Sequence, residues 1–134
     1  MADLSALRKK VYDLNKRRTD AISRVLLTKP YIAAQVYQRY RKCGKSNCKC
    51  VKGELHGPFL WIYQKKKGQK VISTTVAEGK GAEARERAKR YEELLRLRQQ
   101  IRESDQKLNE LLNEFEKELE GEVSEYVKRK ETKA

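Results

Sequence analysis

The chain is organised around the stretch from Cys43 to Phe59, which reads CGKSNCKCVKGELHGPF. This stretch contains all three cysteines and the single histidine of the protein, in the spacing C-x4-C-x-C-x5-H. A structural zinc site holds its metal with four thiolate or imidazole ligands in tetrahedral geometry. The spacing therefore predicts one Zn²⁺ ion, bound by Cys43, Cys48, Cys50 and His56.

The three cysteines fit a disulfide framework or an apolar core less well than a metal site. A disulfide framework would leave one cysteine over, and a bridge between Cys48 and Cys50 would be strained. Cysteines that serve as buried apolar groups need apolar neighbours, whereas this stretch is rich in lysine and glycine. Zinc is the preferred interpretation, another metal or no metal is the alternative, and the C-x-C spacing leaves open which pair shares the ion.

The motif also carries a resemblance. The pattern C-G-K-x-x-C-x-C-x-x-G-x-x-H-G-P-aromatic, followed by an aromatic-rich strand, resembles an uncharacterised prokaryotic and phage family that is described only as a domain of unknown function. The resemblance covers about residues 35 to 76. It implies that the four candidate zinc ligands form one unit, and that the protein is an accessory component of a mobile element or phage.

The apolar pattern predicts an α+β fold, mainly α, in a single domain over residues 1–134. Residues 3–27 are expected to form an N-terminal helix, because apolar residues recur there every three or four positions. Residues 35–76 are expected to form a small, zinc-stabilised, three-stranded antiparallel sheet, because aromatic and β-branched residues alternate there. The stripe of the N-terminal helix consists of Leu4, Leu7, Val11, Leu14, Ala21 and Val25, interrupted at Arg18.

Residues 82–128 predict a long, coiled-coil-like helix, or a helical hairpin that breaks near Ser104 and Asp105. The apolar stripe of this helix consists of Tyr91, Leu94, Ile101, Leu108, Leu112, Phe115, Leu119 and Tyr126. The N-terminal helix is too short to cover the whole stripe. From about Leu108 onward the stripe therefore predicts a further partner, for which a second copy of the chain is the economical choice.

Charge is distributed unevenly along the chain. Residues 1–78 contain 18 Lys or Arg and 5 Asp or Glu, whereas residues 79–134 contain 14 of each kind. The whole net charge of +13 therefore lies in the first part of the chain, as is typical of a surface that binds polyphosphate. The candidate nucleic-acid contacts are Arg39, Arg41, Lys42, Lys45, Lys49, Lys52, Lys65, Lys66, Lys67 and Lys70.

These features together predict a non-enzymatic, zinc-stabilised nucleic-acid-binding protein, with DNA favoured over RNA. A zinc site with four protein ligands has no open position for catalysis, and no second histidine is left for acid–base chemistry. A coiled-coil adaptor that binds an acidic protein is the alternative. The aromatic residues Phe59, Trp61 and Tyr63 either pack inside the protein or stack on bases.

The sequence also bears on where the protein works. No run of about eighteen apolar residues is present, so we expect no membrane partner. The first residues contain no apolar core of a signal peptide. Free thiols beside a metal are typical of a reducing compartment, so we expect a cytoplasmic protein.

Overall fold

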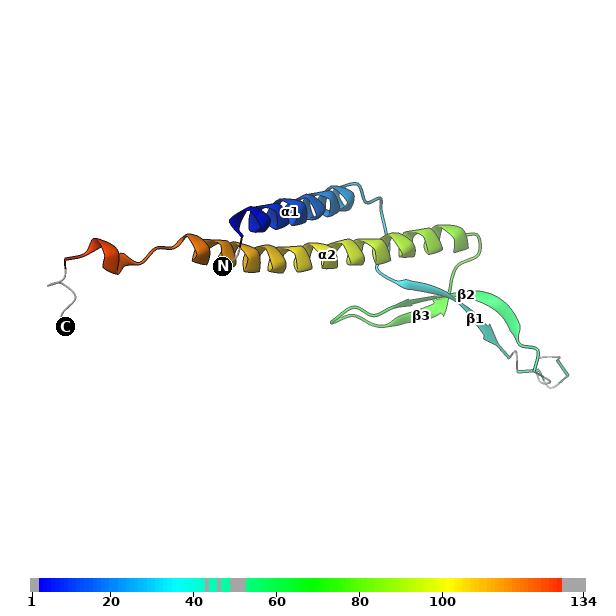
Figure 1. The fold of residues 1–134 in the computed structure, drawn as a ribbon. Coiled ribbons are helices and arrows are strands. Elements are labelled where there is room, and N and C mark those ends of the chain that lie inside the picture. Colours follow the sequence, from blue (N-terminus) through cyan, green and yellow to red (C-terminus); the bar gives the residue numbers. More distant parts are fainter. Residues whose placement is uncertain (1–2, 43, 46, 49–52, 129–134) are drawn as a thin grey trace. The chain divides into compact units, whose positions relative to one another are not determined.

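The structure is a computed structural model that describes residues 3–42, 44–45, 47–48 and 53–128. An N-terminal helix, a three-stranded antiparallel sheet and a long second helix follow one another along the chain, which confirms the predicted α+β, mainly α fold (Figure 1). The elements are α1 (Leu4–Leu26), β1 (Gln35–Arg41), β2 (His56–Gln64), β3 (Ile72–Thr75), α2 (Gly81–Leu119) and the 3₁₀ helix η2 (Val123–Tyr126).

The chain divides into two compact units, which are described separately. The helical unit comprises Met1–Arg24 and Leu97–Ala134, and therefore most of α1 and the second part of α2. The sheet unit comprises Val25–Arg96, and therefore the connection after α1, the three strands and the first part of α2.

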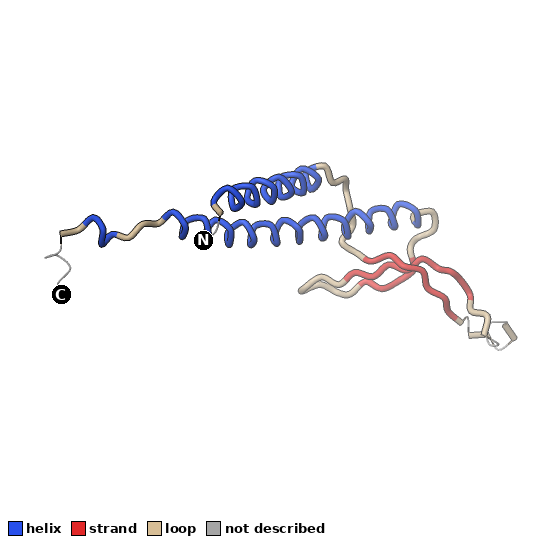
Figure 2. Tube along the Cα trace, viewed as in Figure 1, coloured by secondary structure: helices blue, strands red, loops and turns tan. Residues whose placement is uncertain are grey.

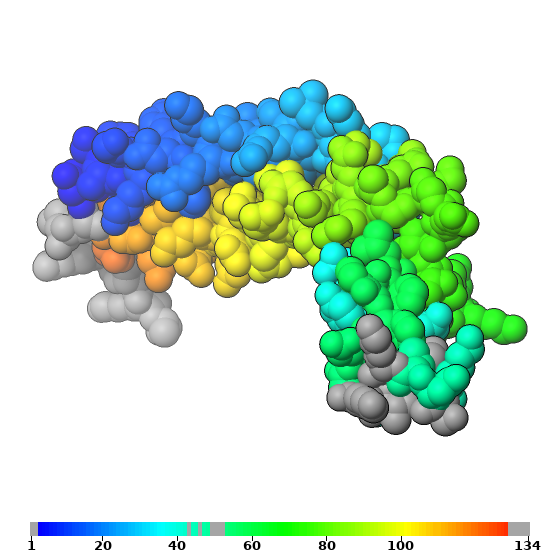
Figure 3. Space-filling model, turned by 90° about the vertical axis from the view of Figure 1, so that its right-hand side faces the viewer, coloured from blue at the N-terminus to red at the C-terminus, as the bar shows by residue number. Residues whose placement is uncertain are grey.

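In the helical unit, α1 runs antiparallel to the second part of α2 (Figure 3). Near the start of α1, the guanidinium of Arg8 lies 5.5 Å from the ring centroid of Phe115. Further along α1, Arg18 Nε donates to a carboxylate oxygen of Asp105. The apolar residues buried in this unit are Leu7, Ala21, Leu97 and Leu111.

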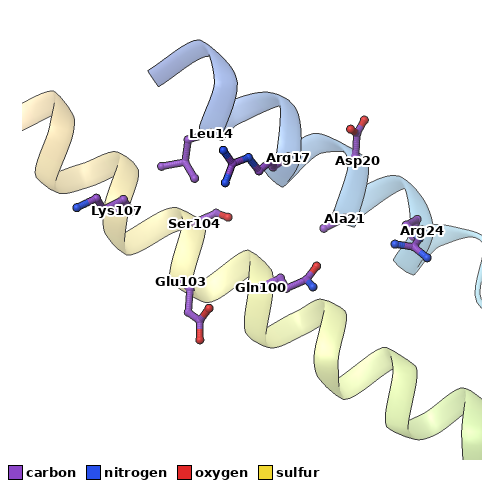
Figure 4. A pocket seen from close by; sticks show the side chains of 9 residues that line it. All are labelled: Leu14, Arg17, Asp20, Ala21, Arg24, Gln100, Glu103, Ser104 and Lys107. Carbon is purple, nitrogen blue, oxygen red and sulfur yellow. The ribbon is translucent and has the colours of Figure 1, made fainter. Parts of the chain in front are cut away.

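The seam between the two helices is partly polar. Figure 4 shows Ala21 of α1 across from Gln100 of α2, and Leu14 across from Ser104 and Lys107. The alternative of a helical hairpin is wrong, because α2 continues unbroken through Ser104 and Asp105. Serine and aspartate disfavour a helix when they bond to nearby backbone, but the carboxylate of Asp105 bonds to Arg18 instead.

The end of α2 differs from the prediction. The helix ends at Leu119 instead of residue 128, two residues before Gly121, whose backbone freedom makes it a poor helix former. The predicted stripe also places the wrong leucine in the seam, since Leu111 is 7% exposed and Leu112 is 43% exposed. Leu119 and Tyr126, the last residues of the predicted stripe, are both exposed.

This arrangement changes the argument for a dimer. The prediction left the stripe from Leu108 onward uncovered, but this is the part of α2 along which α1 runs, with Leu111 buried and Arg8 over Phe115. The premise of the homodimer is therefore only partly right, because Leu112, Leu119 and Tyr126 of the predicted stripe are exposed, and the homodimer stays a prediction. Among the described residues, no helix combines the length and apolar character needed to cross a lipid bilayer.

The neighbouring leucines of α2 provide a direct test of this packing. We expect Leu111→Ala to lower the free energy of unfolding by about 2–4 kcal/mol, because it removes a buried side chain, and Leu112→Ala to lower it by less than about 1 kcal/mol. Both variants change helix propensity equally, so the difference measured by urea denaturation reports burial alone. Equal losses would show that the exposed leucine is covered in solution, as a dimer would require.

Candidate nucleic-acid interface

Strand register decides which side chains share a face of the sheet. Tyr37 of β1 lies opposite Trp61 of β2, and Arg39 lies opposite Phe59. Directly opposed residues of antiparallel strands project to the same side. One side, called the aromatic face below, therefore carries Gln35, Tyr37, Arg39, Arg41, Phe59, Trp61, Tyr63, Ser73 and Thr75.

The opposite face of the sheet packs within the sheet unit. It carries Val36, Leu60 and Ile62, and the side chain of Leu60 lies so close to Gly81, the first residue of α2, that an added Cβ there would be 2.7 Å from it. On the same face, Gln64 Nε2 donates to the carbonyl oxygen of Ala33 at 3.0 Å. The aromatic face is therefore the side turned away from the start of α2.

The connection before β1 is also fixed to the first part of α2. The rings of Tyr31 and Tyr91 stack with their centroids 5.5 Å apart. The backbone N–H of Ile32 donates to the carbonyl oxygen of Arg87 at 3.3 Å. These contacts hold the sheet to its helix on one side and leave the aromatic face outside them.

Arginines cover the two largest apolar rings of the aromatic face. The guanidinium carbon of Arg39 lies 4.6 Å from the ring centroid of Trp61, and that of Arg41 lies 4.8 Å from the ring centroid of Phe59. Such cation–π contacts hold a guanidinium over the face of a ring. The indole is held at its edge as well, because Trp61 Nε1 donates to Ser73 Oγ at 2.9 Å.

A β-bulge sets the geometry next to the cysteine stretch. Arg39 pairs with Phe59 but Arg41 pairs with His56, so β2 contains one extra residue at this point. Gly57 has φ = 136°, and an added Cβ would lie 2.9 Å from the carbonyl oxygen of Arg39. A glycine is therefore required here, both by its backbone conformation and by the close approach of β1.

The structure brings together two of the four predicted zinc ligands. Cys48 Sγ lies 2.9 Å from His56 Nε2, in a part-buried contact. A sulfur and a nitrogen that bind the same tetrahedral Zn²⁺ ion are about 3.5 Å apart. The two atoms would therefore have to move only slightly apart to bind the ion together. Cys43 and Cys50 lie outside the described residues, and the described residues alone contain no group of three or more metal-binding side chains.

The predicted nucleic-acid contacts form two groups instead of one. Arg41, Lys42 and Lys45 lie at the end of the sheet next to the cysteine stretch, whereas Lys65, Lys66, Lys67 and Lys70 lie in the loop after β2. Figure 2 shows these loops at opposite ends of the strands. The nine residues of β2 separate them by roughly 27 Å. Lys49 and Lys52 lie outside the described residues.

A cavity of about 500 Å³ opens at the end of the sheet next to the cysteine stretch. It is lined by Arg41, Lys42, His56 and Phe59, and so combines cationic side chains, an imidazole and an aromatic ring. This lining suits an anionic group attached to a flat ring. Sequence reasoning missed the cavity, because it depends on the bulge that brings His56 opposite Arg41.

Gly57 provides a test of the bulge. We expect Gly57→Ala to lower the free energy of unfolding by about 1–3 kcal/mol, because alanine is strained at this φ and its Cβ meets the backbone of β1. Gly121→Ala is the matched control, since an added Cβ there meets nothing within 4 Å. Thermal unfolding followed by circular dichroism measures both variants, and equal stability would contradict the assigned register.

Comparison with known proteins gives a family but no activity. The family model described as a domain of unknown function, DUF6788, matches residues 8–88, which is more than half of the chain. This agrees with the resemblance of the cysteine motif to an uncharacterised family. Searches of the curated proteins and of the solved structures found no match.

Proposed function

This chain belongs to the DUF6788 family, and we propose that it is a non-enzymatic nucleic-acid-binding protein that contacts its ligand through the sheet unit. One observation carries the proposal. Eight basic residues of the sheet and its loops are exposed, and within the described part of the chain none of them forms an ion pair. They are Arg39, Arg41, Lys42, Lys45, Lys65, Lys66, Lys67 and Lys70.

The basic residues of α2 behave differently. Several of them are paired within the helix with acidic residues three or four positions away: Arg87 with Glu83, Arg90 with Glu86, and Lys107 with Glu110. Cations without carboxylate partners gain most from a polyanion, because phosphate contacts release the counterions condensed on the nucleic acid. The contrast supports the sheet and its loops, and not α2, as the binding element.

We propose that one Zn²⁺ ion, held by Cys43, Cys48, Cys50 and His56, organises the loop between β1 and β2. The contact between Cys48 and His56 supports this assignment. The metal would hold the loop that carries Lys45 in one conformation and thereby fix the position of the charged Lys45 side chain. The motif resemblance and the thiol-rich loop favour DNA as the ligand, an accessory or regulatory role in a mobile element or phage, and a cytoplasmic setting.

Metal analysis tests the zinc proposal. Protein purified without added metal is expected to contain about one zinc per chain, and a chelator is expected to lower its thermal stability. Cys48→Ser should reduce the zinc content, whereas Lys45→Ala, in the same loop, should not. Cys43→Ser and Cys50→Ser test the other two ligands in the same way, and wild-type protein without metal would overturn the assignment.

Salt dependence tests the nucleic-acid proposal. We expect the triple variant Lys65→Ala/Lys66→Ala/Lys67→Ala to bind DNA more weakly, with the salt slope reduced by about one unit for each lysine that contacts a phosphate. The measurement is fluorescence anisotropy of labelled DNA over a salt series.

The matched control for this variant is Arg98→Ala/Arg102→Ala/Lys117→Ala, which removes the same charge from exposed positions of α2 in the helical unit. If both triple variants lose the same affinity, net charge alone governs binding and the sheet unit is not the interface. If the wild-type protein binds no nucleic acid at low salt, the proposed function is wrong, and an acidic protein becomes the preferred partner.

A further inference from the structure

We infer that the aromatic face binds single-stranded nucleic acid, with unpaired bases stacked against its rings and arginines. The inference rests on the proposed function and names the form of nucleic acid that this surface takes. It depends on strand register, which the sequence alone does not specify.

The first argument is that this face is aromatic and outside the packing of the sheet unit. Leu60, on the opposite face, contacts the start of α2. The aromatic face instead presents Tyr37, which is 41% exposed, beside the half-buried rings of Phe59 and Trp61. Sheet aromatics that are reached from solvent are the stacking platform of proteins that bind single strands.

The second argument is the chemistry of the arginines. Arg39 and Arg41 lie over Trp61 and Phe59, so each guanidinium contacts a ring and, among the described residues, forms no ion pair with a carboxylate. A guanidinium plane stacks on bases, and its N–H edge donates to phosphate oxygens. Each arginine–ring pair can therefore bind a base and its phosphate at one position.

The third argument is the distribution of charge along the face. The two basic groups lie at opposite ends of β2, roughly 27 Å apart, with the Arg39–Trp61 pair between them and the Arg41–Phe59 pair at the end next to the cysteine stretch. An extended strand could pass from the lysines of one loop, over the rings, to the cavity lined by Arg41, Lys42 and His56. A duplex could contact the lysines but not the rings, because its bases are stacked inside the helix.

The protein carries a built-in reporter for this surface, because Trp61 is its only tryptophan. The experiment titrates full-length protein with a single-stranded oligonucleotide of about ten nucleotides, a length in the range that single-strand-binding folds cover. The same sequence as a duplex is titrated in parallel. We expect the single strand to quench Trp61 emission strongly and the duplex to bind with little quenching.

Variants extend the measurement. Tyr37→Val removes a ring but keeps a residue that favours a strand, and we expect it to weaken single-strand binding by about five- to one-hundred-fold. Tyr126→Val, which removes an exposed ring from η2, is the matched control and should leave affinity unchanged. Circular dichroism of each variant verifies that the sheet is retained, and the wild-type quenching result stands even if Tyr37→Val does not fold.

The outcomes separate this inference from the proposed function. If both nucleic acids bind but neither quenches Trp61, the inference is wrong and the proposed function survives. Equal quenching by single strand and duplex would also overturn the inference. If neither binds at low salt, the proposed function itself fails. Quenching by an acidic peptide but not by nucleic acid would assign the face to a protein partner and overturn both.

Discussion

The pairing of β1 with β2 is the interaction on which the sheet unit depends. It places Tyr37 opposite Trp61 and Arg39 opposite Phe59, and so gathers rings and guanidiniums on one side. A slip by one residue would send every side chain of a strand to the other face, and would bring the arginines against the start of α2. The bulge at Gly57 fixes this register, because no other residue fits there without strain.

The sequence was sufficient to predict the elements but not their alignment. Apolar periodicity predicted both helices, and aromatic alternation predicted the strands, because those signals are local. The partner of Arg18 and the pairing of Arg39 with Trp61 depend on residues far along the chain, and no local pattern encodes them. Leu111 and Leu112 lie three and four positions after Leu108, and both spacings are helical, so the local pattern does not decide which of the two leucines is buried. The four-ligand set stays a prediction, since only Cys48 and His56 lie in the described part of the chain.

Charge compensation distinguishes the two parts of the chain. Along α2, acidic and basic residues pair at helical spacing, so this helix needs no external counter-charge. The described cations of the sheet and its loops, by contrast, form no ion pairs with carboxylates. A polyanion that binds this unit would therefore also stabilise it, since a ligand that prefers the folded state shifts the folding equilibrium.

The ion pair between Arg18 and Asp105 has a consequence for how the two helices align. Apolar seams tolerate sliding, because leucine and alanine contacts one turn apart are nearly equivalent in energy. The ion pair makes such alignments unequal, because moving α1 by one turn, about 5.4 Å, would separate the guanidinium of Arg18 from the carboxylate of Asp105. The arginine that interrupts the stripe of α1 therefore favours one alignment of the two helices over the others.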